Sequence, residues 1–118
     1  MLRILVVEDT SELVSVWKRQ IASKKFEARI VWAASVQRAE EEFTQNPDFD
    51  AIIMDCCVPG NQPTTLNLTK MIRQRGFTNP IIAKSSHPDY CNMLLEAGAS
   101  HVAVNGNVVL ALLNALES

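Results

Sequence analysis

The chain has no long uninterrupted hydrophobic run. Of its 118 residues, 47% are hydrophobic and 20% are charged. No apolar stretch approaches the roughly 18 residues that a membrane-spanning helix needs. The first residues, LRILVVED, contain no small-residue cleavage site and end in acids, so they do not have the pattern of a signal peptide. These absences argue against a membrane protein or a secreted one, and they predict a cytoplasmic location.

Cysteine and excess positive charge are also scarce. The three cysteines include an adjacent pair, Cys56 and Cys57, and form neither a disulfide framework nor a metal-ligand spacing. The alternative, a redox-sensing pair, is disfavoured because adjacent cysteines rarely form a disulfide. A net charge of −2, with no Lys or Arg from Ser85 onwards, gives no electrostatic basis for binding nucleic acid. We therefore expect no direct contact with nucleic acid.

Repeats, linkers and low-complexity segments are absent as well, so residues 1–118 are predicted to form one domain. Short hydrophobic segments alternate with helical patterns, which is typical of βαβ units. Strands are predicted at residues 2–7, 28–33, 51–54, 80–84 and 101–104. With right-handed crossovers, these strands predict an α/β fold with a doubly wound parallel sheet of order 2-1-3-4-5.

Helix start signals lie between the predicted strands. Ser35 is a predicted N-cap, and Pro88 is predicted at a first helical position. The third helix is predicted from about Thr64 to Arg75, and a fifth helix fills the end of the chain. Each helix carries an apolar stripe at helical spacing, which in the first helix is Leu13, Val16, Trp17 and Ile21.

The fifth helix has an outer face with little charge. Val109, Leu112, Leu113 and Leu116 are predicted to face the sheet. Leu110, Ala111, Asn114 and Ala115 are predicted to face outward. An outer face of this kind indicates a dimer or partner surface. The alternative is that these residues are simply neutral helix formers.

Polar side chains follow three of the predicted strands. Glu8 and Asp9 follow the first strand, Asp55 follows the third, and Ser85 follows the fourth. Because the carboxyl ends of parallel strands meet in one crevice, these groups are expected to lie close together. Clustered carboxylates repel one another unless a cation lies among them, and oxygen ligands suit a hard divalent ion such as Mg²⁺. Taken singly, the same residues could be solvated loop acids, a turn former and a helix-capping hydroxyl.

The complete pattern resembles the receiver domain of two-component response regulators, of the chemotaxis-regulator type, whose fold is the flavodoxin-like (βα)5 sandwich. The resemblance covers essentially the whole chain. Pro59 and Gly60 match the pair that follows the phosphoacceptor, and Gly98-Ala99 matches the turn before the fifth strand.

The resemblance implies a role for each polar group. It makes Asp55 the aspartate that accepts a phosphoryl group and Ser85 the switch hydroxyl. It also implies that Asp9 and Asp55 ligate Mg²⁺ directly, that Glu8 does so through water, and that the Cys57 backbone carbonyl completes the protein ligands.

The resemblance further implies partners. The phosphoryl donor would be a phosphohistidine on a sensor histidine kinase or a phosphotransfer protein. The signal would pass to an output domain or target protein through the face formed by helix 4, strand 5 and helix 5, which is also the expected homodimer surface. The chain would have no enzymatic activity beyond its own phosphotransfer and dephosphorylation, and it could be stand-alone or part of a longer regulator.

Two positions depart from the family pattern. The usual lysine falls on Asn105, whose amide donates only a neutral hydrogen bond, and the usual switch aromatic falls on Val102. Lys84 is a candidate replacement for the lysine, but alternation along a strand predicts that it points to the face opposite Ser85. The alternative function is therefore a degenerate receiver that acts as a phosphorylation-independent interaction module. A flavin-binding domain of similar topology is disfavoured, because the acidic first loop, EDTSE, would repel a flavin phosphate.

Overall fold

The structure, a computed structural model, describes residues 1–24 and 27–117, and within these residues five parallel strands form one sheet of order β2-β1-β3-β4-β5. The strands are β1 (Leu2–Val7), β2 (Ala28–Ala33), β3 (Ala51–Asp55), β4 (Ile81–Lys84) and β5 (His101–Val102). The predicted doubly wound α/β fold and its strand order are confirmed. So are the predicted bounds of β1 and β2.

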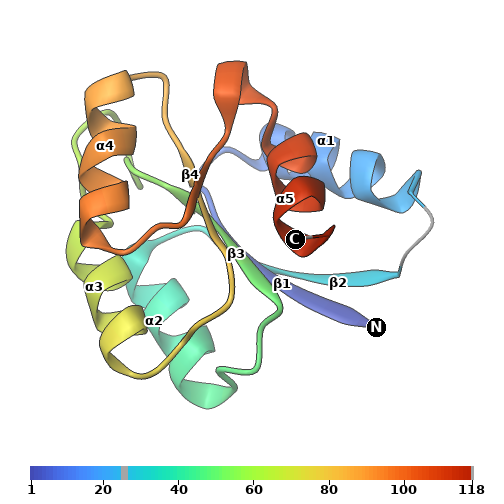
Figure 1. The fold of residues 1–118 in the computed structure, drawn as a ribbon, viewed down its shortest axis with the longest axis horizontal. Coiled ribbons are helices and arrows are strands. Elements are labelled where there is room, and N and C mark those ends of the chain that lie inside the picture. Colours follow the sequence, from blue (N-terminus) through green and yellow to red (C-terminus); the bar gives the residue numbers. More distant parts are fainter. Residues whose placement is uncertain (25–26, 118) are drawn as a thin grey trace.

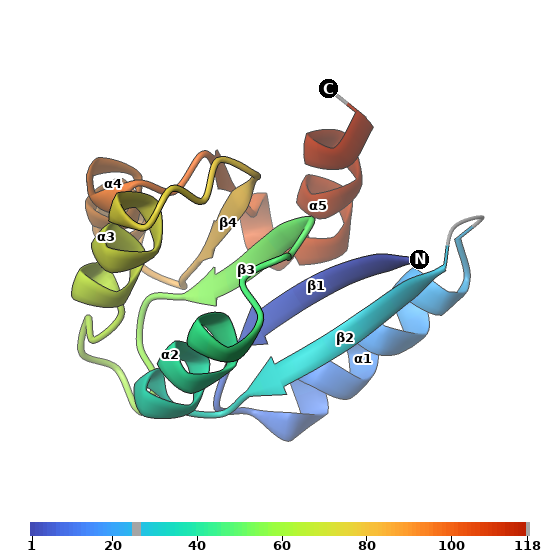
Figure 2. The same ribbon diagram turned by 90° about the horizontal axis from the view of Figure 1, so that it is seen from below.

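Helices cover both faces of the sheet (Figures 1 and 2). They are α1 (Ser11–Ala22), α2 (Val36–Gln45), α3 (Leu66–Gln74), α4 (Pro88–Ala97) and α5 (Val108–Glu117), with a short 3-10 turn, η1 (Val104–Gly106), before α5. Helices α2, α3 and α4 pack on one face, where Ile52 and Met54 of β3 are buried. Helices α1 and α5 pack on the other face, over Ile53 of β3 and Ile82 of β4.

The predicted start of α2 is confirmed in detail, whereas that of α3 is wrong by two residues. Ser35 accepts a hydrogen bond from the Arg38 backbone N–H at 3.1 Å, as an N-cap should. Pro88 is the first residue of α4. Helix α3 begins at Leu66 instead of Thr64, because the Thr65 hydroxyl bonds to backbone carbonyls at the end of β3 and holds the preceding loop out of the helix.

The carboxyl-terminal part of the sheet differs from the prediction. Strand β5 ends at Val102, two residues early, because the chain turns into η1, where Asn105 has a positive φ of 53°.

The buried stripe of α5 is rotated about the helix axis relative to the predicted one. Val108, Val109, Leu112 and Ala115 are buried, while Leu113 and Leu116 are only partly so. The predicted outward position of Ala115 is therefore wrong, and that of Leu110, which is 57% exposed, is correct.

Among the described residues, no helix is both long enough and apolar enough to cross a membrane.

Candidate functional site

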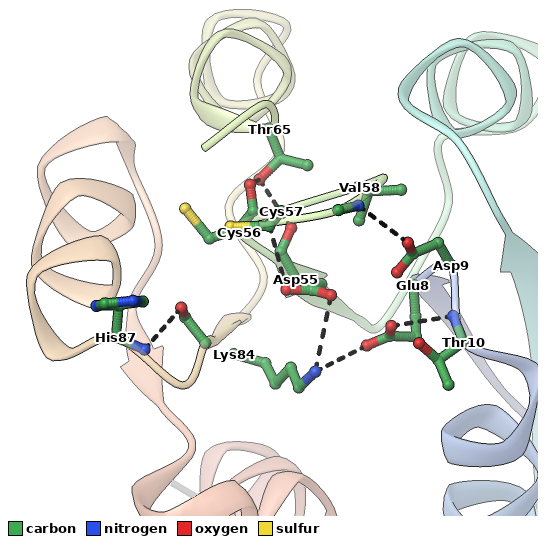
Figure 3. Close-up of polar contacts among 12 residues, drawn as sticks. Glu8, Asp9, Thr10, Asp55, Cys56, Cys57, Val58, Thr65, Lys84 and His87 are labelled. Carbon is green, nitrogen blue, oxygen red and sulfur yellow. Dashed lines mark hydrogen bonds and ion pairs between the residues drawn. The ribbon is translucent and has the colours of Figure 1, made fainter. Parts of the chain in front are cut away.

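The predicted acids meet at the carboxyl edge of the sheet. Parallel pairing of β1 with β3 places Val7 opposite Met54, so the residues that follow them are neighbours. One carboxylate oxygen from each of Glu8, Asp9 and Asp55 lies within 4.8 Å of the others. These acids line a cavity of about 190 Å³ at the ends of β1, β3 and β4 (Figure 3). The convergence predicted from strand-end positions is confirmed.

The three acids differ strongly in exposure. Glu8 is fully buried, Asp55 is 6% exposed, and Asp9 is exposed. Burial, and then the charge of Asp55, raise the pKa of Glu8 from 4.5 to about 7. Burial also raises the pKa of Asp55, although its partners Cys57 N–H and Lys84 oppose the shift. Near pH 7, Glu8 in the metal-free cluster is therefore partly protonated, and a bound cation would favour loss of that proton.

Backbone groups fix the position of each carboxylate. Asp55 Oδ1 accepts a hydrogen bond from Cys57 N–H at 3.2 Å. Asp9 Oδ2 accepts one from Gly60 N–H at 3.3 Å, which ties the first loop to the loop after β3. Glu8 Oε2 accepts one from Thr10 N–H at 3.1 Å. The cluster is thus held by the chain itself, as a preorganised site requires.

Two threonines that were predicted only as part of a helix start support the loop after Asp55. The buried Thr65 hydroxyl donates to the Asp55 carbonyl at 2.8 Å. Thr64 Oγ1 accepts from Val58 N–H at 2.8 Å and donates to Val58 O at 2.8 Å. No pattern in the sequence distinguished this role from helix capping, because both use a hydroxyl at the same position.

Lys84 lies in the acidic cavity, and the prediction that it points away is wrong. Its Nζ is 3.2 Å from Glu8 Oε1 and 3.7 Å from Asp55 Oδ2. The register pairs Asp55 with Lys84, and each lies two residues beyond an isoleucine that is buried under α1 and α5. Both side chains therefore leave the sheet on the same face. The error came from extending strand alternation to Ser85, which lies beyond the end of β4 at Lys84.

Ser85 lines the acidic cavity, but its hydroxyl has a local partner. Ser85 Oγ accepts a hydrogen bond from His87 N–H at 3.1 Å, immediately before α4. This bond is not a helix cap, because the N-cap of α4 is His87 and no side chain caps that helix, so the capping alternative is not confirmed. The bond leaves the hydroxyl proton free to donate to a group in the cavity, so the switch role stays a prediction.

Asn105 lies outside the acidic cavity. It is exposed, in η1, and lines a neighbouring cavity of about 550 Å³ together with Val102 and Lys84. Among the described residues that line the acidic cavity, neither Asn105 nor Val102 occurs. The position that matches the family lysine therefore lies outside the acidic cavity in this structure.

Trp32, near the end of β2, contacts the site. Its indole Nε1–H donates to the Glu8 backbone carbonyl at 2.6 Å, and the side chain is 39% exposed. The signal for this contact was its place near the end of β2, next to β1 in the sheet. This hydrogen bond therefore helps to hold the Glu8 backbone in place at the end of β1.

The cysteines are buried free thiols. Burial raises the pKa of Cys56 to about 12 and also raises the pKa values of Cys57 and Cys91. Because the thiolate is the reactive form, these side chains are unreactive near neutral pH. This agrees with the preference for inert cysteines over a redox pair.

A parallel sheet of this order, with three acids and a lysine at its carboxyl edge, defines a chemotaxis-regulator-like α/β domain. The family model described as response regulator receiver domain matches residues 4–104. The chain therefore belongs to the response regulator receiver domain family. The comparison with curated proteins found no significant match.

Solved structures of receiver domains have the same fold. A response regulator receiver domain protein from Clostridium thermocellum is 21% identical, with a TM-score of 0.78 over 99% of this chain and 95% of that one. The non-phosphorylated receiver domain of HemR from Leptospira biflexa is 22% identical, with a TM-score of 0.78 over 100% and 96%. A LuxR-family two-component response regulator from Aurantimonas is 25% identical, with a TM-score of 0.76 over 98% and 81%.

Proposed function

We propose that this receiver domain is a phosphorylation switch in which Asp55 accepts a phosphoryl group in a Mg²⁺-dependent reaction. The observation that carries the proposal is the position of Asp55. Two of the three clustered acids, Glu8 and Asp55, pair with Lys84. Of these two, Glu8 is fully buried, whereas Asp55 keeps an exposed fraction of 6% toward an incoming group. A site that combines clustered oxygen ligands with a fixed cation suits the transfer of a highly charged group.

The oxygen donors of the cluster fit a hard divalent ion. Asp9 and Asp55 would supply carboxylate ligands, the Cys57 carbonyl would supply a neutral one, and Glu8 would act through water. Bound Mg²⁺ would shield the charge of the attacked carboxylate and of the incoming phosphoryl group. The hydrogen bond from Cys57 N–H to Asp55 Oδ1 orients the carboxylate for attack.

The reaction transfers one group and changes no oxidation state. A carboxylate oxygen of Asp55 forms a bond to phosphorus, and the bond from phosphorus to the donor's leaving atom breaks. The leaving group departs with the bonding electron pair.

In the cell we propose a phosphohistidine on a sensor kinase or phosphotransfer protein as the donor of the phosphoryl group. The signal would then pass to an output domain or target protein. The domain would act in the cytoplasm, with no catalysis beyond its own phosphotransfer and dephosphorylation.

A single experiment tests Asp55. The purified protein is incubated with acetyl phosphate, with and without Mg²⁺, and its intact mass is recorded beside that of Asp55→Asn. We expect one added phosphoryl group that requires both Mg²⁺ and Asp55, because the amide of Asn cannot act as the nucleophile. Asp48→Asn is the matched control, since Asp48 is an exposed acid outside the cluster, and it should be labelled like the wild type.

Labelling that persists in Asp55→Asn would contradict the assignment. A wild-type protein that binds Mg²⁺ and is labelled neither by acetyl phosphate nor by a phosphohistidine donor would favour the alternative, a phosphorylation-independent interaction module. The exposed position of Asn105 is the observation that supports this alternative.

The affinity for Mg²⁺ is expected to depend on pH. Since the folded-state pKa of Glu8 is raised to about 7, and that of Asp55 is raised too, protons compete with the metal ion below neutral pH. Affinity should fall by up to roughly tenfold per pH unit below pH 7 and level off above it. Isothermal titration calorimetry from pH 5.5 to pH 8.5 measures this dependence. A flat profile would show that Glu8 is already ionised throughout.

A further inference from the structure

We propose that Lys84, at the end of β4, is the cationic catalytic residue of the phosphoryl site, and that Asn105 has no part in the chemistry. This inference rests on the proposed function of Asp55. It assigns the positive charge of the site to a strand and position that differ from those of the family pattern.

The first argument is geometric. Lys84 Nζ is 3.7 Å from Asp55 Oδ2, the oxygen opposite the one that accepts from Cys57 N–H. Its other neighbour is Glu8 Oε1, at 3.2 Å. The ammonium group thus lies between the carboxylates of Glu8 and Asp55, as the dashed contacts of Figure 3 show. A phosphoryl group added to Asp55 would arrive within reach of it.

The second argument is the charge of the site. Three carboxylates face the cavity, and phosphorylation adds further negative charge. Lys84 is the last Lys or Arg of the sequence. It is also the one Lys or Arg side chain among the described residues that line the acidic cavity. The segment from β5 to α5, which holds Asn105, contains no Lys or Arg.

The third argument is that the lysine is held in place. Parallel pairing sets Lys84 beside Asp55, and neighbouring Ala83 and Ile82 are fully buried on opposite faces of the sheet. The buried strand fixes the backbone position from which the Lys84 side chain enters the cavity. Lys84 is only 22% exposed, so its interactions with the acids are weakly screened by solvent.

Lys84→Met tests the proposal, because Met keeps most of the side-chain length and removes the charge. Labelling by acetyl phosphate and Mg²⁺ affinity by calorimetry are measured together. Loss of a positive group that stabilises the transition state should slow labelling by about 100-fold. Mg²⁺ affinity should stay equal or become tighter, because a competing cation has left the acids. The expected result is therefore slower labelling without weaker Mg²⁺ binding.

Three further variants sharpen the comparison. Lys84→Arg keeps the charge and should retain much of the labelling rate. Lys18→Met removes the charge of an exposed lysine on α1 that lies outside the acidic cavity. This variant should be labelled like the wild type. Asn105→Gly removes the side chain with its amide, and glycine readily adopts the positive φ of this position. Labelling of this variant should therefore be unchanged.

Each contrary result has a distinct meaning. Labelling of Lys84→Met at the wild-type rate, or a large loss in Asn105→Gly, would overturn the assignment to Lys84 and leave Asp55 as phosphoacceptor. Loss of both labelling and Mg²⁺ binding in Lys84→Met would show a structural role and would also overturn the assignment. A wild-type protein that is never labelled would overturn the proposed function and this inference with it.

Discussion

Glu8→Gln is expected to increase the free energy of unfolding of the metal-free protein by about 2 kcal/mol at pH 8 and by little at pH 5. Glu8 is fully buried, and its folded-state pKa is raised from 4.5 to about 7. The folded state therefore holds a proton there that the unfolded chain has lost. The contribution of protonated Glu8 to the free energy of unfolding is complete below pH 4.5, and it is lost as the pH rises through 7. A neutral amide of the same shape avoids that loss, although it gives up the ion pair with Lys84.

The same substitution should weaken Mg²⁺ binding by roughly 10- to 100-fold, the usual cost of losing an outer ligand of a metal site. Urea unfolding at pH 5 and pH 8, with and without Mg²⁺, measures both effects. The matched control is Glu12→Gln, an exposed acid in the first turn of α1 outside the acidic cavity, which should change neither quantity appreciably. A variant less stable than the wild type at pH 8 would show that the ion pair with Lys84 outweighs the cost of burying Glu8. The expected gain in stability at pH 8 would instead mean that the buried acid is retained for its function at the expense of stability.

Leu112→Ala is expected to lower the free energy of unfolding by about 3 kcal/mol. Leu112 is fully buried where α5 packs on the sheet, in the cluster that contains Ile53 and Ile82. Truncation removes apolar contacts and leaves a cavity between α5 and the strands that carry Asp55 and Lys84. Urea denaturation followed by circular dichroism gives the change in the midpoint.

Leu110→Ala is the matched control on the same helix, because Leu110 is 57% exposed. It should change stability by less than about 0.5 kcal/mol. Equal losses in the two variants would mean that α5 does not present Leu112 to the sheet as the structure shows. A small loss in both would mean that α5 contributes little to the stability of the domain.

The fold could be predicted from the sequence because its signals are local. Strand β1 is followed by the acids Glu8 and Asp9, strand β2 is preceded by Glu27, and the predicted limits of both strands agree with the structure. Ser35 and Pro88 are helix start signals whose chemistry acts within one turn. The three carboxylates could be predicted to meet because chain order and the handedness of the crossovers determine which strand ends are neighbours.

The orientation of α5 could not be predicted from periodicity alone. Apolar residues occupy so much of the surface of α5 that several stripes could face the sheet. In the structure, the stripe that packs on the sheet is the one that includes Ala115. The end of β5 was similarly ambiguous. The residues after Val102 continue an apolar run, yet the chain leaves the sheet for η1.

By itself, the sequence determined the class of fold and the identity of the acids, because both follow from patterns along the chain. Only the tertiary structure decided which cation accompanies those acids. That depends on the register of β3 with β4, which is set by contacts between distant segments. Asp55 and Lys84 are 29 positions apart in the sequence, yet parallel pairing makes them neighbours on one face of the sheet.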